Sequence, residues 1–313
     1  MDNLAIILPD FLIIFLGLFL REKLRYDETF WKHAERLVFY VLFPPLLFMS
    51  VAQSQITPSS AALFLAVGVA SMLLAVAASA GLRFLVKDDA LTHASVFQCG
   101  FRFNTYIGFA ICTQLFDDTG FALLALLIAF WVPISNTIAV SVLASAVAQR
   151  EAGTVQKRKP VWKTVATNPL IIATVLGLVW NVAKLPLPAT AAVFLKHLGS
   201  ASLALGLLCI GAGLRLNAFK SHLKLISGAV VERLIVVPLI AWGMGYAFGL
   251  APVEAGVLLL FAALPTAQSC YVMTASMRGD AASVANVTTA QTLVSMATLP
   301  VWTAVIVRIL AAS

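Results

Sequence analysis

Charged residues are scarce in this sequence, and no long polar stretch interrupts it. Charged side chains make up 11% of the chain, against about 25% in an ordinary soluble domain, and hydrophobic residues make up 61%. Apolar runs separated by short polar connections extend over all 313 residues, without a hydrophilic block long enough for a soluble domain. The sequence therefore predicts one integral membrane domain, residues 1–313, in a lipid bilayer.

Motifs for metals, cofactors and nucleotides are also missing. The chain has only 4 cysteines and 4 histidines, without Cys-x-x-Cys spacing, which argues against a disulfide framework or a zinc site. It has no Gly-x-x-x-x-Gly-Lys phosphate loop, so nucleotide-driven pumping is not expected. Cations in the connecting loops account for the net charge of +7 without nucleic acid as a partner. We expect no cofactor and no metal, with Na⁺ or H⁺ as the candidates for a coupling ion.

Apolar segments long enough to cross a bilayer recur along the chain. The first has no cation before its apolar run and no cleavage site after it, so it is predicted to be a membrane helix and not a signal peptide. Most Lys and Arg residues fall in the odd-numbered connections, and the opposite side holds only Lys184, Lys196 and Arg308. Because cytoplasmic loops are rich in cations, both termini are predicted to be extracytoplasmic. The predicted spans are residues 3–20, 37–53, 61–86, 93–115, 121–148, 167–183, 198–214, 225–250, 254–275 and 284–310.

The longest basic loop, residues 149–163, divides the chain into repeat 1 (about 1–148) and repeat 2 (about 164–313), with an odd number of spans in each. The two halves must then have opposite orientations, which is the condition for an inverted repeat. In such folds substrate binds near the membrane midplane at broken helices. The predicted fold is an all-α polytopic membrane protein, a 5+5 inverted repeat of ten transmembrane helices with helices 4 and 9 broken.

Polar residues interrupt the fourth and ninth spans at matching positions. Pro265 removes a backbone hydrogen bond, so the ninth helix should break there, whereas Gly108 in the fourth is a weaker breaker. Arg102 is the most informative residue, because a cation inside a membrane helix costs at least about 2.5 kcal/mol and marks a functional site. A guanidinium binds a carboxylate through two hydrogen bonds, so the expected partner is an anionic substrate. Snorkelling or an internal ion pair is the alternative, and Glu232 with Arg233 forms another predicted buried charge pair.

At these residues the chain resembles the auxin efflux carrier family of membrane transporters, most closely its bacterial malonate-transporter branch. The resemblance extends over nearly the whole chain and is carried by these residues: Phe101, Arg102, Asn104 and Gly108; Leu264, Pro265, Thr266, Ser269 and Tyr271; Gly279 and Asp280; residues 291–295; Leu299 and Pro300; Pro133 and Asn136. It implies unwound fourth and ninth helices that cross at mid-membrane beside a bound carboxylate. It also implies a bacterial inner-membrane protein.

The resulting hypothesis is a secondary transporter of a small organic anion, with malonate as the best single substrate, working by alternating access. The substrate-binding candidates are Arg102, Asn104, Thr105, Tyr106, Gly108, Pro265, Thr266, Gln268, Ser269 and Tyr271, with Asn136, Asn286 and Gln291 as supporting polar residues. For any one of these, a role in helix packing is the alternative.

Other functions and partners remain open. An auxin-like or other monocarboxylate efflux carrier, and a membrane carboxylate sensor, would use the same site. An intramembrane enzyme is not expected, because no histidine lies mid-span to activate Ser269 or Cys270. The Gly-x-x-x-Gly motif at Gly245 and Gly249 could mark a homodimer contact, but packing within the chain is favoured.

Overall fold

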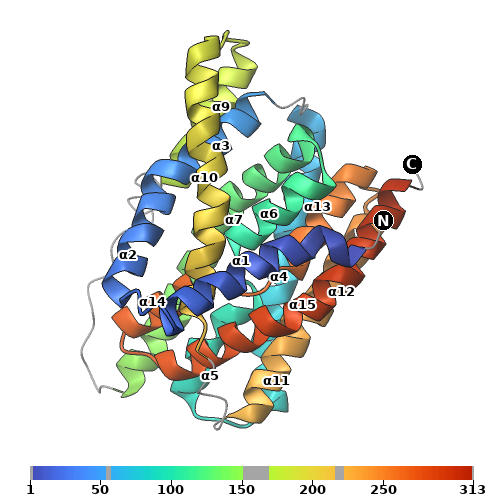
Figure 1. Cartoon of the computed structure of the whole chain (residues 1–313). Coiled ribbons are helices and arrows are strands. Elements are labelled where there is room, and N and C mark those ends of the chain that lie inside the picture. Colours follow the sequence, from blue (N-terminus) through green and yellow to red (C-terminus); the bar gives the residue numbers. More distant parts are fainter. Residues whose placement is uncertain (1–2, 54–57, 151–168, 216–221, 312–313) are drawn as a thin grey trace. The chain divides into compact units, whose positions relative to one another are not determined.

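The computed structural model describes residues 3–53, 58–150, 169–215 and 222–311, and every regular element in these ranges is a helix (Figure 1). This is the expected outcome for a membrane chain, because a helix satisfies its own backbone polar groups in the absence of water. Six helical stretches are long and apolar enough to cross a membrane: Glu28–Ala52, Ala61–Leu85, Asp118–Arg150, Ala189–Gly213, Leu223–Ala247 and Ala281–Ala311. The chain is therefore an all-α polytopic membrane protein, and the count of ten spans stays a prediction.

Contacts divide the chain into two compact units, each built from segments that are distant in sequence. Unit 1 comprises residues 1–65, 106–130 and 160–213, and unit 2 comprises 66–105, 131–159 and 214–313. Each unit therefore combines parts of both predicted repeats. Of the predicted connecting loop, residues 151–163 lie outside the described part of the chain.

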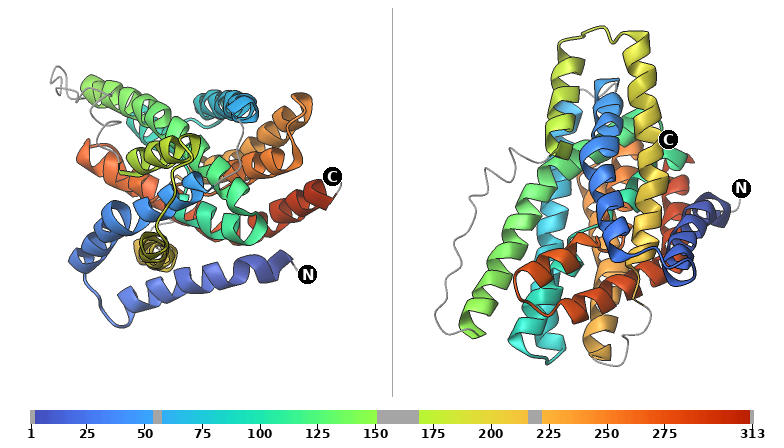
Figure 2. Two further views of the ribbon diagram at one scale, coloured as in Figure 1. Left: turned by 90° about the horizontal axis from the view of Figure 1, so that it is seen from above. Right: turned by 60° about the vertical axis from the view of Figure 1, so that its left-hand side comes forward.

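Unit 1 contains the N-terminal helices and the middle of the chain. Its elements are α1 (Asn3–Glu22), α2 (Glu28–Leu37), the π-helix η1 (Val38–Leu42), α3 (Phe43–Ala52), most of α6 (Thr105–Leu115), the start of α7 (Asp118–Arg150), α9 (Pro169–Val182) and α10 (Ala189–Gly213). Helix α1 crosses α10 in close contact (Figure 2), and glycines on both helices allow the approach. A Cβ on Gly17 would lie 2.1 Å from the Leu208 carbonyl oxygen, and one on Gly211 would lie 1.7 Å from that of Ile14. Close backbone approach through small residues is a common way to pack membrane helices.

Unit 2 contains the rest of the chain and both predicted interruptions. Its elements are most of α4 (Pro58–Leu85), α5 (Ala90–Val96), the 3₁₀ helix η2 (Phe97–Gly100), the second part of α7, α11 (Leu223–Val231), the π-helix η3 (Glu232–Val236), α12 (Val237–Ala247), α13 (Pro252–Ala263), α14 (Ser269–Ser276) and α15 (Ala281–Ala311). Helix α13 contacts both α12 and α15. All but its first few residues are buried, which matches the continuous apolar sequence after Glu254.

The Gly-x-x-x-Gly motif has a local explanation in the structure. Helix α12 ends at Ala247, and Gly249 has a φ of +62° in the turn that follows. The Gly249 amide donates to Tyr246 O (3.2 Å) and the Leu250 amide to Gly245 O (3.0 Å), the paired bonds of a Schellman helix end. Gly249 therefore serves the helix end, and the two glycines do not form one continuous helix face.

Candidate functional site

The fourth predicted span is broken completely. Helix α5 and η2 run to Gly100, α6 starts at Thr105, and residues 101–104 between them are not helical. The expectation that Gly108 weakens this helix is wrong in position, because Gly108 is buried inside α6. The break contains no proline. Its backbone N–H and C=O groups are outside any helix and need hydrogen-bond partners, which other elements supply. The Trp131 indole donates to Phe101 O (3.0 Å), and Arg233 donates to Gly100 O (3.2 Å).

The ninth predicted span breaks where the sequence predicts. Helix α13 ends at Ala263 and α14 begins at Ser269, with Pro265 between them. Leu264 has an extended backbone (φ −66°, ψ 141°), the conformation that a following proline favours. Proline chemistry therefore sets this break locally, in contrast to the first one.

The two broken segments are hydrogen-bonded to each other, and we call residues 99–104 and 264–269 the crossover. The Asn104 amide donates to Pro265 O (2.8 Å), and the Thr266 hydroxyl donates to Cys99 O (2.5 Å). Gln291 of α15 contacts both sides: its Oε1 accepts from the Thr266 amide (3.0 Å), and its Nε2 donates to Cys99 O (3.4 Å). Non-helical backbone at membrane depth is tolerated where protein groups or a water-filled cavity satisfy it, and here protein groups do so.

Arg233 donates hydrogen bonds to both segments of the crossover. It is fully buried, and its guanidinium donates to three backbone carbonyls: Nε to Leu264 O (2.7 Å), Nη1 to Gly100 O (3.2 Å) and Nη2 to Phe261 O (3.2 Å). These carbonyls stand at the C-terminal ends of η2 and α13, where a cation complements the negative end of the helix dipole. The predicted Glu232–Arg233 charge pair is buried as expected, but no ion pair joins the two side chains in the described residues.

Arg102 lies in the first break with 9% of its surface exposed. Its Nη1 donates to Gln98 Oε1 (2.7 Å) and its Nη2 to Ser269 Oγ (3.0 Å). Within the described ranges no Asp or Glu lies at ion-pair distance from it, so the internal ion pair is not seen. Ser269 is the first residue of α14, where the positive end of the helix dipole also favours an anion. Arg102 is thus a nearly buried cation whose protein partners are neutral, beside a second source of positive potential.

Three of the other predicted site residues belong to the crossover, and Tyr271 lies beside it. Asn104 and Thr266 are buried within the crossover, and Gln268 adds a buried Nε2 without a hydrogen-bond partner among the described residues. Tyr271 packs against a hydrophobic cluster that includes Cys99 and Cys270, and it is not part of the Arg102 hydrogen-bond set.

The remaining candidates are distributed over α6, α7 and α15. Tyr106 and Gly108 belong to unit 1, where the Tyr106 ring stands edge-on to Phe43 at 5.3 Å. Thr105 begins α6 and is half-buried. Asn136 is half-buried in α7, and Asn286 is buried in α15.

The sequence did not indicate which residues position Arg102 and bond to the backbone of the first break. Gln98 orients Arg102 and itself donates to Thr274 Oγ1 (2.9 Å), and Trp131 and Arg233 hold the first break open. Gln98 lies four residues before Arg102, and this helical spacing is a signal that could have found it. The roles of Trp131 and Arg233 depend on contacts across the fold and have no local signal.

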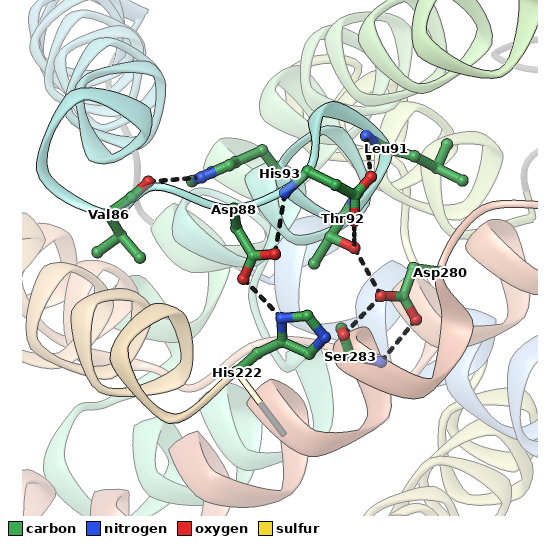
Figure 3. Close-up of polar contacts among 9 residues, drawn as sticks. Val86, Asp88, Leu91, Thr92, His93, His222, Asp280 and Ser283 are labelled. Atoms are coloured by element: carbon green, nitrogen blue, oxygen red, sulfur yellow. Dashed lines mark hydrogen bonds and ion pairs between the residues drawn. The ribbon is translucent and has the colours of Figure 1, made fainter. Parts of the chain in front are cut away.

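A second polar cluster, seen in Figure 3, joins three connections of unit 2. The Thr92 hydroxyl donates to Asp280 Oδ2 (2.9 Å), the Asp280 amide donates to Ser95 Oγ (2.9 Å), and His222 Nδ1 pairs with Asp88 Oδ2 (2.6 Å). The Asp88 hydrogen bond raises the pKa of His222. Burial would raise the pKa of Asp280, but hydrogen bonds from Ser283 and Thr92 outweigh it, and the pKa is lowered. The cluster ties the start of α5 to the connections that precede α11 and α15, away from the crossover.

Two broken helices that cross in a multi-pass membrane fold, with a buried cation at one break, are typical of secondary transporters. A model of the family described as Membrane transport protein matches residues 4–303, and the chain belongs to this family. This is a family of transporters and not of enzymes, in agreement with the sequence prediction and with the resemblance to auxin efflux carriers. No curated protein matches the chain.

Proposed function

We propose that this membrane transport protein is a secondary transporter of a small organic anion, with a carboxylate bound at the crossover between Arg102 and the N-terminus of α14. The observation that carries the proposal is the environment of Arg102: 9% exposure, neutral protein partners, and a hydrogen bond to the first residue of α14. Burying a charge without a partner is costly, so a bound carboxylate would complete the site.

The architecture supports alternating access as the mechanism. We infer ten spans in a 5+5 inverted repeat, because helical segments occupy each predicted span and both breaks fall at corresponding places in the two halves. Units 1 and 2 would be the two bodies that move, since each draws on both repeats. Cation-rich connections support a cytoplasmic side opposite to both termini, in a bacterial inner membrane.

Malonate is the first substrate to test, because the resemblance to the malonate-transporter branch selects it. A dicarboxylate also suits one strong cation combined with a helix N-terminus. Uptake of radiolabelled malonate into proteoliposomes should saturate, and unlabelled succinate should compete better than acetate, while neutral malonamide should not compete.

Two variants of Arg102 and one control make the assay specific for the site. Arg102→Ala should abolish uptake, and Arg102→Lys should retain only a small part of it, because lysine lacks the paired donors that match a carboxylate. Arg308→Ala, at an exposed position in the last turn of α15, should transport normally. Saturable binding of malonate without flux would instead favour the sensor, and wild-type uptake that is insensitive to Arg102→Ala would overturn the proposed site.

A further inference from the structure

We propose that Glu232 and Ser79 form a proton-binding site that couples anion transport to a proton gradient. This inference rests on the proposed function, since it assigns the driving ion of that transporter. Glu232 is the first residue of η3, within the membrane-spanning stretch Leu223–Ala247, and it is 7% exposed. Helical π-turns of this kind are often found at functional sites.

The two short contacts of Ser79 can both be hydrogen bonds only when the Glu232 carboxyl group carries a proton. Ser79 Oγ lies 2.5 Å from Glu232 Oε1 and 3.0 Å from Ala75 O. A serine hydroxyl has one proton, so it cannot donate to both oxygens at once. If Glu232 is protonated, it donates to Ser79 and Ser79 donates to Ala75 O, so both short contacts are hydrogen bonds.

Arg233, the cation next to Glu232 in the sequence, does not neutralise an ionised Glu232 through an ion pair. Arg233 directs its donors to three backbone carbonyls, and within the described ranges it makes no ion pair with Glu232. The titratable groups that act on Glu232 are Arg233 on its own element and Cys99 on η2, while α4 presents the Ser79 hydroxyl, which does not titrate. An ionised Glu232 would therefore be a buried carboxylate with one hydrogen bond, an arrangement that favours proton uptake.

The carboxyl group is in direct contact with the crossover. A Cβ placed on Gly100 would lie 2.2 Å from Glu232 Oε1, 2.7 Å from Oε2 and 2.0 Å from Ser79 Oγ, so the carboxyl group rests on the Gly100 backbone. The Gly100 carbonyl also accepts from Arg233, and Gly100 precedes the anion-binding Arg102 by two residues. Protonation removes a negative charge beside the anion site, so proton and anion should each strengthen the binding of the other.

The test uses full-length protein in proteoliposomes and compares two kinds of transport. Counterflow exchange of labelled malonate, or of succinate if the competition assay selects it, reports substrate movement without a proton gradient. Accumulation driven by an imposed inward proton gradient reports coupling, and about one pH unit should concentrate the anion up to about tenfold for one proton per anion. Glu232→Gln, which mimics the protonated side chain, should keep counterflow and lose this gradient-driven accumulation.

Matched variants separate coupling from folding. Glu254→Gln alters another buried carboxyl group, which accepts from the Ala251 amide at the start of α13, and it should retain both activities. Ser79→Ala should keep counterflow and shift its pH dependence, because it removes the proton acceptor of Glu232. Gradient-driven accumulation by Glu232→Gln, or wild-type counterflow without any proton-driven accumulation, would overturn the inference. Absence of wild-type counterflow for every carboxylate would overturn the proposed function, and the coupling with it.

Discussion

At the scale of single residues, two buried arginines of unit 2 have opposite relations to their surroundings. Arg233 donates to three backbone carbonyls at the ends of two helices. Arg102 contacts neutral side chains and stands beside the N-terminus of a helix, where a cation is disfavoured. The three bonds of Arg233 stabilise the fold, and the proposed role of Arg102 is to bind a ligand at some expense of stability.

This contrast makes a prediction about stability. Arg233→Met should lower the free energy of unfolding by about 3–5 kcal/mol, because it leaves three buried carbonyls without their charged donor. Arg102→Met should leave thermal stability unchanged or raise it, since an apolar side chain replaces a buried unneutralised cation. Thermal unfolding of both variants in one detergent measures the difference, with Arg308→Met as the exposed control. Equal destabilisation by the two buried substitutions would refute the separation of roles.

At the scale of elements, the two broken helices are produced in different ways. Pro265 predicts the break between α13 and α14 from local chemistry, and the structure places the break there. The break at residues 101–104 has no proline, and Gly108 does not supply the break because it lies within α6. Donors from Trp131 and Arg233 hold that break, and such long-range partners cannot be read from a single sequence.

The cluster around His222 and Asp280 joins the start of α5 to the connections before α11 and α15, and it predicts a pH dependence. Because the Asp88 hydrogen bond raises the pKa of His222, the pair stabilises the fold at acidic pH and loses its contribution as pH rises through the raised pKa. The pKa of Asp280 is lowered, so its contribution is present at neutral pH and is lost only in acid. Between about pH 6 and about pH 8, where histidine titrates, the His222 pair is the one that changes.

The measurement is the melting temperature of wild type and His222→Gln across that pH range. Wild type should lose a contribution of less than about 1 kcal/mol as pH rises, since the pair is partly exposed to solvent. The His222→Gln variant should show a flatter profile, and His197→Gln, which alters an exposed histidine of unit 1, should follow wild type. Parallel profiles for wild type and His222→Gln would show that the pair contributes nothing.

At the scale of the whole molecule, the sequence predicts the class of protein better than the division of the fold. Low charge and repeated apolar segments predict an all-α polytopic membrane protein, and this is confirmed. The chain's contacts form two units that each mix both halves of the sequence, which local patterns do not reveal. Arg102 could be predicted because an intramembrane cation is conspicuous in an apolar sequence, whereas Glu232 and Arg233, adjacent and opposite in charge, suggested a simple pair.

The central claim is that a carboxylate binds at the crossover and is exposed to each side of the membrane in turn. The most direct test places a single cysteine at Ser269, which is exposed and accepts a hydrogen bond from Arg102, in a background whose 4 native cysteines are replaced. A membrane-impermeant thiol reagent, applied to one side of the vesicle at a time, should modify Ser269→Cys from both sides, and malonate should slow both reactions. Modification from one side only, or at a rate that malonate does not change, would contradict the account.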